Sequence, residues 1–355
     1  MNPNSLQNWL TQLVGDNPIP VVVVCALPLV FILLYSLVAI LGEMKISSWL
    51  QDRVGPMRTG WKGTLQPLAD VLKLMQKEDT TPGNADKLYY NLAPYLAFIA
   101  AYAAFAALPF SAAYMGASLN VGVFYIVAIS SLGVAAILMA GWSSDNKFSM
   151  YGAVRSVSQI ISYEIPAGLA ILCIVMIAGS LDLNQISAAQ AGGIQNWYIF
   201  GGPFPWAKRL ALLPVMIVLF VIYYITSLAE TNRTPFDIAE GESELVAGYH
   251  TEYSAMKFAM FFMAEYANMF VVSAIAATLF FGGWQSPFGH FLDGPLWGAI
   301  WFILKGCLFV AVQIWLRWTL PRLRVDQLMA LCWKVLLPFT LACVIATAGI
   351  IVWLP

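Results

Sequence analysis

Long apolar segments alternate with shorter polar ones along most of this chain. A helix needs about 20 mostly apolar residues to cross the hydrocarbon core of a bilayer. Eight segments satisfy that requirement, at residues 19–42, 92–112, 122–142, 160–180, 210–229, 258–281, 296–317 and 334–354. The pattern therefore predicts an all-α polytopic membrane protein, with eight transmembrane helices in a single transmembrane domain over residues 1–355.

Positive charges are distributed unevenly over the loops that join these segments. With eight spans, both termini lie on one side, and loops 43–91, 143–159, 230–257 and 318–333 lie on the other. Those four loops hold nearly all of the Lys and Arg residues, whereas the opposite loops hold only Lys208 and Arg209. Because loops rich in Lys and Arg stay in the cytoplasm, we expect the charged loops on the cytoplasmic side and both termini on the opposite side.

The first charged loop contains a segment with helical periodicity. In QPLADVLKLMQKED (66–79), apolar residues recur on one helix face, at Leu68, Val71, Leu72 and Met75. This spacing predicts an amphipathic helix at about 64–78 that lies at the membrane interface. A Gly/Pro-rich turn with a cationic surface precedes it. The pattern is typical of a lipid anchor and, equally, of a helix that belongs to a functional site.

Composition agrees with a membrane protein and excludes several classes of site. The 355 residues are 60% hydrophobic, their mean hydropathy is +0.74 and their net charge is −1, so no nucleic-acid partner is expected. The five cysteines are dispersed without a CxxC spacing, and there are two histidines, which argues against a metal, iron–sulfur or haem site on this chain. No basic segment precedes the first apolar run, so no cleaved signal peptide is expected. We find no internal repeat, which counts against an inverted-repeat transporter.

Three carboxylates stand where ionisation is costly. Glu164 and Glu265 lie inside the fourth and sixth apolar segments, and Glu230 closes the fifth. Such a group faces the bundle interior, holds a proton or pairs with a cation. It is either a structural hydrogen-bonding residue or part of a proton relay, and several such acids at the same ends of different spans favour the relay. Lys305 is the one deep cation, able to pair with an acid or to extend to the surface.

Six carboxylates gather in AETNRTPFDIAEGESELVAGYHTEY (229–253), at Glu230, Asp237, Glu240, Glu242, Glu244 and Glu252. Pro235 disfavours helix at the residue before it, and Arg233 can pair with Glu230 if the helix continues that far. Asp237 is a candidate N-cap for a new helical turn, with Glu240 in the capping-box position.

Glu240 and Glu244 are i,i+4 neighbours, so their repulsion is expected to raise one pKa. The segment is either a solvated loop or a site of proton exchange near neutral pH. His250 is expected to form local hydrogen bonds rather than to bind a metal.

The sequence resembles a known family in four long blocks. They are QDRVGPMRTGWKGTLQPLADVLKLMQKE (51–78), GWSSDNKFSMYGAVRSVSQIISYEIP (141–166), AETNRTPFDIAEGESELVAGYHTEYSAMKFAMFFMAEY (229–266) and RWTLPRLRVDQLMALCWKVLLP (317–338). In order and spacing they are similar to the membrane subunits of proton-pumping NADH:quinone oxidoreductase (respiratory complex I) that join its peripheral arm to its membrane arm. The family comprises the H-type subunits of bacteria and the subunit 1 type of mitochondria.

The resemblance implies a quinone-chamber and proton-coupling subunit of the bacterial inner membrane. The family forms the membrane side of a quinone tunnel, while NADH, FMN and the iron–sulfur clusters belong to partner subunits. Quinone is then a substrate, no redox centre or catalytic residue lies on this chain, and no metal is expected. The implied partners are the peripheral-arm subunits of the quinone site, small membrane subunits, antiporter-like subunits and membrane lipids.

The resemblance also assigns residues. The proton relay corresponds to Glu164, Glu230, Glu265 and Glu252, and the quinone chamber and tunnel to Glu43, Lys45, Arg53, Asp70, Arg233, Asp237, Glu240, Glu242, Glu244, Arg317, Arg322 and Arg324. Two positions depart from the family pattern: Met44 stands where the family commonly has Arg, and Met57 where it often has Asn. The missing Arg removes a permanent charge near the expected tunnel entrance.

Two other interpretations stay open. Membrane-bound hydrogenases, F420H2 dehydrogenases and the photosynthetic-type complex contain homologous subunits, and these complexes differ in electron donor. An independent ion transporter is a different class, against which the lack of a repeat counts. The sequence does not distinguish ubiquinone from menaquinone.

Overall fold

The chain forms a bundle of helices in the computed structural model, which describes residues 19–353 except 118, 239–240, 290 and 293. Eight helical stretches are long and apolar enough to cross a membrane. They are α2 (Ile19–Leu50), α4 (Lys87–Phe105), α5 (Gly122–Ser143), α6 (Lys147–Ala178), α8 (Trp206–Glu230), α10 (Ala255–Phe280), α11 (Pro295–Thr319) and the continuous stretch α12 (Val325–Leu331), η5 (Cys332–Leu336) and α13 (Leu337–Trp353). The prediction of an all-α fold with eight membrane-spanning helices is confirmed.

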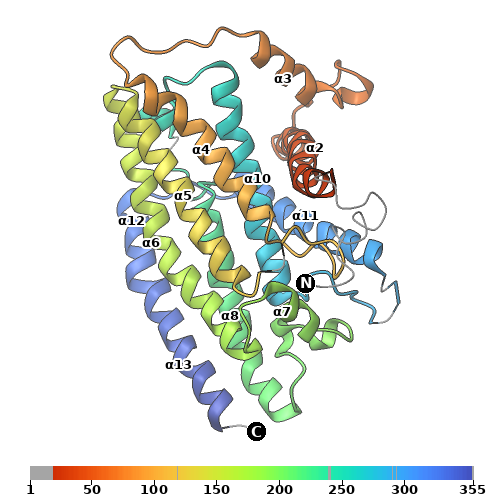
Figure 1. The fold of residues 1–355 in the computed structure, drawn as a ribbon. Coiled ribbons are helices and arrows are strands. Elements are labelled where there is room, and N and C mark those ends of the chain that lie inside the picture. The colour runs from red at the N-terminus through yellow and green to blue at the C-terminus, as the bar shows by residue number, and fades with distance from the viewer. Residues whose placement is uncertain (1–18, 118, 239–240, 290, 293, 354–355) are drawn as a thin grey trace.

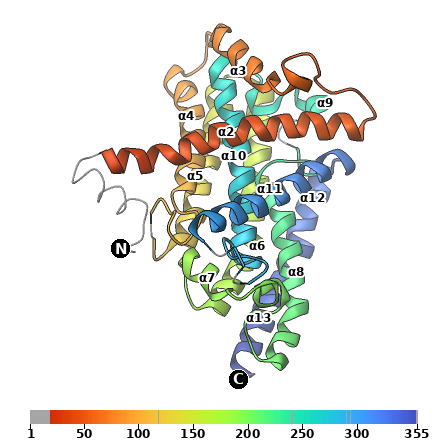
Figure 2. The same ribbon diagram turned by 90° about the vertical axis from the view of Figure 1, so that its right-hand side faces the viewer.

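α10 forms the centre of the bundle, where it contacts α4, α8, α11 and α2. In its most hydrophobic window 67% of the residues are buried, compared with 24% in α2. Figure 1 shows α4, α5, α6, α8 and α13 running roughly side by side along the long direction of the molecule. α2 is seen nearly end-on in that view and crosses in front of the bundle in Figure 2. α2 therefore has one face on the core and a long face turned outward.

Several helix ends differ from the apolar segments of the sequence; the last span, for example, begins at Val325 rather than at 334. α2 continues to Leu50 through the polar residues after position 42, because no Gly or Pro breaks it before Gly55. α4 ends at Phe105 rather than at 112, and the chain then turns back through an isolated bridge between Pro109 and Met115. α6 begins at Lys147, well before 160, where the Asn146 side chain caps the helix by accepting from the Phe148 N–H at 2.9 Å.

The predicted amphipathic helix is present as α3 (Gln66–Gln76), after the short η1 (Trp61–Gly63). Leu68, Leu72 and Met75 share its exposed apolar face, with 46%, 51% and 62% of their surfaces accessible. Short elements also close the two ends of the bundle: α9 (Glu242–Leu245) and η4 (Gly248–His250) near α3, and α7 (Leu183–Ala189), η2 (Ile194–Asn196) and η3 (Tyr198–Phe200) at the opposite end.

The sequence suggested that Lys305 pairs with an acid or extends to the surface. In the structure it is buried, and it has no acidic partner among the described residues. Its ammonium donates to the carbonyls of Phe281, Gly283 and Gln285 at 2.7, 2.9 and 2.8 Å. It also lies 4.4 Å from the centroid of the Trp197 ring. These carbonyls follow the C-terminus of α10, where the helix dipole favours a cation. Lys305 therefore fixes the end of the central helix, far from the charged loops.

Candidate functional site

Four charged side chains meet where α2, α10, α11 and the segment after α8 converge. Arg233, only 3% exposed, lies 3.4 Å from Glu43 through Nη1 and 3.2 Å from Glu265 through Nε. Arg317 makes a second ion pair with Glu43, and the Tyr266 hydroxyl donates to the same carboxylate at 2.6 Å. We call Glu43, Arg233, Glu265 and Arg317 the charged cluster. Two carboxylates face two guanidinium groups, so burial of these charges is compensated.

The turn after α8 directs Arg233 into this cluster. α8 ends at Glu230, and Asn232 then adopts a left-handed conformation (φ 50°), which Asn tolerates better than most residues. The Asn232 side-chain oxygen accepts from the Gln159 amide at 3.2 Å, and Gln159 also donates to the Ala229 carbonyl at 2.8 Å. Because α6 holds the turn in this way, Arg233 enters the core. The pairing of Glu230 with Arg233 that the sequence allowed would require α8 to continue to Arg233, but α8 ends at Glu230.

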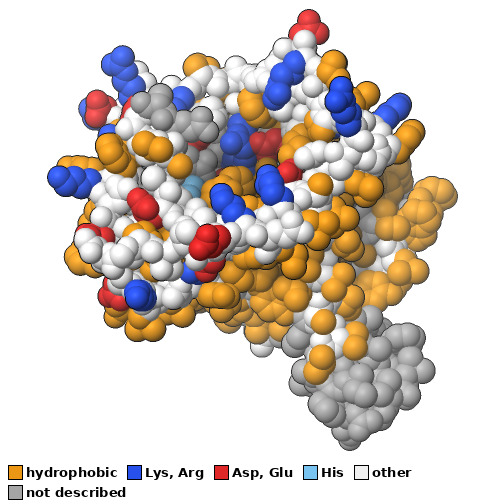
Figure 3. Space-filling model, turned by 90° about the horizontal axis from the view of Figure 1, so that it is seen from above, with side chains coloured by type: hydrophobic (Ala, Val, Ile, Leu, Met, Phe, Trp, Pro, Cys, Tyr) orange, Lys and Arg blue, Asp and Glu red, His pale blue; other side chains and the backbone are white. Residues whose placement is uncertain are grey.

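A cavity of about 730 Å³ adjoins the charged cluster at the charged end of the bundle. Its lining is part polar and part aromatic: Thr234, Asp237, Gly241, Ala247, His250, Phe258, Phe262, Arg317, Trp318 and Arg322. Seen from above, acidic and basic side chains crowd around a hollow in this face (Figure 3). We call this cavity the chamber. Its size is that of a small-molecule site, and its arginines suit a ligand with an apolar ring and acceptor oxygens.

Two smaller cavities, of about 60 and 40 Å³, lead from the charged cluster into the membrane-spanning part. The first is lined by Glu265 and Glu230 and the second by Glu230 and Glu164. Ser130 and Asn268 line both cavities. Each has room for one or a few waters, and its polar groups are suitable partners for them. Glu265, Glu230 and Glu164 therefore lie in sequence along one polar path.

The deep end of this path differs from the charged cluster in the pairing of its acids with cations. Glu164 and Glu230 make no ion pair with any residue between 19 and 353 that the structure describes, and the Glu164 Oε1 atom is buried without a hydrogen-bond partner there. An ionised carboxylate left in that state costs several kcal/mol. The deep acids therefore have no described cation beside them, whereas Glu43 and Glu265 each lie against Arg233.

The acidic loop is held to the outer ends of its neighbours. Glu244 pairs with Arg155 at 2.7 Å and with Arg322 at 3.5 Å. The hydrogen bond from Arg155, together with the charge of Arg322, lowers the pKa of Glu244 below its usual value of 4.5. The expected repulsion between Glu240 and Glu244 stays a prediction, because Glu240 lies outside the described residues. Glu252 accepts from the Asn146 amide at 2.5 Å and does not line either small cavity.

The helical turn that Asp237 was expected to cap falls on residues 239–240, outside the described residues, so that cap stays a prediction. The next described helical turn is α9, whose N-cap is Gly241. Asp237 is half-buried and lines the chamber. The capping-box partner Glu240 lies outside the described residues, and the placement of the Glu242 side chain is not described either. His250 is buried against Tyr249, with ring centroids 3.8 Å apart, and also lines the chamber.

The remaining residues that the resemblance assigned to the tunnel lie outside the charged cluster. Lys45 donates to the Pro56 carbonyl at 2.5 Å and to the Met57 sulfur at 3.6 Å, so Met57 is an acceptor for it. Arg53 is exposed and bonds to Gln51. Asp70 pairs with Lys73 on α3 at 3.1 Å. Arg324 is exposed at the start of α12, where its N–H bonds to Gln327.

Several residues of the site were missed by sequence reasoning. Tyr266 bonds to Glu43 across 223 positions, and Ser130 and Asn268 line the polar path from two different helices. Each is a polar residue in an apolar segment. That signal could have identified Asn268, which lies three residues beyond Glu265. Their partners are distant in sequence, so spacing alone does not pair them.

Comparison with known proteins gives a consistent result. A protein-family model described as NADH dehydrogenase matches residues 22–348. The H subunit of the NADH-quinone oxidoreductase of Chlorobaculum tepidum is 54% identical over 359 residues, which cover 97% of each chain. The H subunit of the Chlorobium luteolum enzyme is 53% identical and covers 99% of this chain and 96% of its own. An H subunit of the Geobacter sulfurreducens enzyme, numbered 1, is 47% identical, over 91% and 92% of the two chains.

Proposed function

This chain belongs to the NADH dehydrogenase family, as a membrane subunit of the H type, and we propose that it couples quinone reduction to proton translocation within an NADH:quinone oxidoreductase. In this proposal the chamber is the membrane side of the quinone site. Peripheral-arm subunits close the chamber and carry NADH, FMN and the iron–sulfur clusters. The charged loops face the cytoplasm, and small membrane and antiporter-like subunits adjoin the deep end of the polar path.

One observation carries the proposal: the chamber and two half-buried carboxylates are joined through the charged cluster. Arg317 belongs both to the chamber wall and to the charged cluster. Glu265 belongs both to the charged cluster and to the first small cavity. A change of charge in the chamber therefore reaches Glu230 and Glu164 through side chains that touch in succession or share a water-sized cavity. Glu252 lines neither of the two small cavities and lies outside this path.

Electrostatics supplies enough energy for this coupling. Two unit charges about 4 Å apart interact by roughly 4 kcal/mol at an effective dielectric of about 20. Since about 1.4 kcal/mol corresponds to one pKa unit, a charge that appears in the chamber and releases Arg317 from Glu43 can alter proton occupancy further along the path. Quinone reduction takes up two electrons and two protons, so the chamber undergoes such a change in every cycle. The carboxylates transmit it without a covalent carrier.

The proposal is tested in the assembled enzyme with Glu164→Gln, Glu230→Gln and Glu265→Gln. Glu78→Gln, at an exposed position in the first charged loop, is the matched control. We expect the control to keep its ratio of protons translocated per NADH oxidised, and each buried variant to lose at least half of it. Quinone reductase rate and proton uptake are measured on the same vesicles. Normal values of both in all three variants would rule out the relay.

The identity of the electron donor has its own test. The homologous subunits of hydrogenases and F420-dependent dehydrogenases are the alternative, and the relatives described above are all named as NADH-quinone oxidoreductase subunits. We expect a tagged chain to co-purify from its membrane with a flavoprotein that oxidises NADH. Recovery with a hydrogenase module instead would replace the donor and leave the coupling path unchanged.

A further inference from the structure

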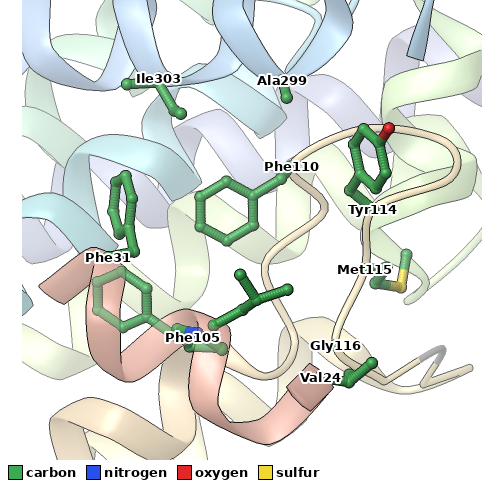
Figure 4. Close-up of a pocket in the computed structure, with 11 residues that line it drawn as sticks. Val24, Phe31, Phe105, Phe110, Tyr114, Met115, Gly116, Ala299 and Ile303 are labelled. Carbon is green, nitrogen blue, oxygen red and sulfur yellow. The ribbon is translucent and has the colours of Figure 1, made fainter. Parts of the chain in front are cut away.

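An apolar groove lies along α2, at the opposite end of that helix from Glu43. It encloses about 410 Å³ between α2, α4, α11 and the segment that follows α4. Leu27 and Phe31 of α2 form one wall, Phe105 and Phe110 the second, and Ala299 and Ile303 of α11 the third. Figure 4 shows the aromatic rings and Ile303 turned toward a common space, with Tyr114 and Met115 at its edge. This groove plays no part in the coupling path.

The groove lies within the membrane-spanning part of the molecule. Its α2 residues fall inside the candidate span Val22–Leu50, Phe105 is the last residue of the span formed by α4, and Ala299 belongs to the first turns of the span formed by α11. Leu27, at the rim, is 48% exposed. Other outward residues of α2 are also apolar and exposed, such as Val30 at 49% and Val38 at 69%. The groove therefore opens toward lipid hydrocarbon rather than toward water.

Water is a poor occupant of this space. A stable internal water needs two to four polar partners, and the lining consists of aliphatic and aromatic groups apart from the Tyr114 hydroxyl and the Met115 sulfur. An empty groove of this size would deprive its walls of dispersion contacts on one side. The bilayer supplies a flexible, apolar chain at the open rim. We propose that the groove binds one acyl chain of a membrane phospholipid.

Aromatic residues at the floor of the groove separate the bound acyl chain from the quinone site. Phe270 of α10 packs against Phe31 and Tyr35, with ring centroids 5.1 and 5.0 Å apart. Tyr35 is 8% exposed and fills the helix face between Phe31 and Glu43. Along α2, those two residues are separated by about 18 Å at 1.5 Å per residue. The aromatic floor closes the groove toward the charged cluster, so its occupant comes from the surrounding lipid rather than from the quinone in the chamber.

A bound chain has a structural role. α2 is poorly covered by the rest of the protein, yet it carries Glu43 into the charged cluster. An acyl chain in the groove contacts α2, α4 and α11 together and extends the contact that α2 makes with the core. The bound lipid then stabilises the position of α2 against the core. This inference does not depend on the proposed proton path.

The test uses the assembled enzyme in nanodiscs that contain phosphatidylcholine with a diazirine in one acyl chain. After irradiation, adducts on α2 and α11 are mapped by peptide mass spectrometry. Ala299→Phe fills the groove from α11, and Ile300→Phe adds the same ring to the neighbouring, 49% exposed position as a control. We expect adducts to concentrate on Leu27, Phe31 and Ile303, with at least a tenfold loss in Ala299→Phe and less than a twofold loss in Ile300→Phe.

Three results would overturn the inference. Adducts spread evenly over all exposed residues of α2, unchanged in Ala299→Phe, would mean ordinary contact with bulk lipid. Stronger labelling of the groove by a quinone with a diazirine in its tail would assign the site to quinone. Crosslinks from a groove residue to another polypeptide would assign it to a partner helix. Ala299→Leu, a smaller change, is made in parallel and should give an intermediate loss, so the result does not depend on one bulky variant.

Discussion

Replacement of Arg233 by Met tests the charged cluster most directly. The change keeps a long, flexible side chain but removes the positive charge that faces Glu43 at 3.4 Å and Glu265 at 3.2 Å. It also removes a cation 4.8 Å from the centroid of the Tyr266 ring. Arg317 still pairs with Glu43. The variant therefore leaves two buried carboxylates with one remaining arginine.

The expected cost follows from burial. Unit charges about 3.3 Å apart attract by roughly 5 kcal/mol at an effective dielectric of about 20, before desolvation is considered. Removal of one partner from a buried pair costs about 3–5 kcal/mol, because the other charge stays buried. We expect a loss of that size in the free energy of unfolding. Removing the orphaned charge as well, in Arg233→Met with Glu265→Gln, should restore at least about 1 kcal/mol, since residues in one network couple.

Arg155→Met is the matched control. It breaks an ion pair of 2.7 Å, but the two side chains are 32% and 53% exposed. Pairs of that kind contribute about 0–1 kcal/mol. Unfolding of the purified chain in detergent is followed by fluorescence over a denaturant series for all variants. Equal losses in Arg233→Met and Arg155→Met, or no recovery in the double variant, would contradict the view that the cluster is a buried, charge-balanced unit.

Three further predictions concern other parts of the molecule. The folded-state pKa of Glu244 is lowered, so its ion pairs stabilise the loop fully above the ordinary pKa of 4.5 and are lost as pH falls through the lower folded value. Protease cleavage of segment 241–253 should therefore increase at that low pH. Glu244→Gln should abolish this pH dependence. Lys305→Met should lower the free energy of unfolding by about 3 kcal/mol or more, because three carbonyls lose a charged donor, as a denaturant series would measure. Gly152→Ala should cost about 1–3 kcal/mol, because its Cβ would lie 2.7 Å from the Gly248 Cα, whereas Gly349→Ala, with nothing within 4 Å, should be neutral or stabilising in the same assay.

The sequence predicts the helices well because the bilayer imposes a strict length and polarity on them. Runs such as 122–142 and 258–281 differ by three residues or fewer at each end from the helices α5 and α10. Errors occur where capping rather than hydrophobicity decides. α6 gains a long polar first section because Asn146 caps it, and Pro109 lies in a turn that the apolar composition of 92–112 concealed.

The site was only partly predictable, since its contacts are long-range. Reasoning from spacing considered Glu230 as a partner for Arg233, and the structure pairs Arg233 with Glu43 and Glu265 from two other helices. The resemblance placed Glu43 near the tunnel but gave it no partner. Local patterns report neighbours at three or four positions, and a membrane bundle brings together side chains that are separated by 190 positions or more. The sequence predicted that an acid is buried, but it did not predict which cation pairs with that acid.

In the proposed relay, the balance of charge along the path sets where proton transfer begins. At the charged cluster, two carboxylates meet two arginines that cannot deprotonate in a protein, so negative charge there is balanced. Beyond Glu265, the small cavities offer Ser130 and Asn268 but no described cation that would balance Glu230 or Glu164. The boundary between acids that have an arginine beside them and acids that do not lies between Glu265 and Glu230. In the relay that we propose, a chamber event that draws Arg317 away from Glu43 leaves excess negative charge at this boundary, and a proton moving from Glu230 toward Glu265 neutralises it. The direction of the first transfer thus follows from where the arginines end.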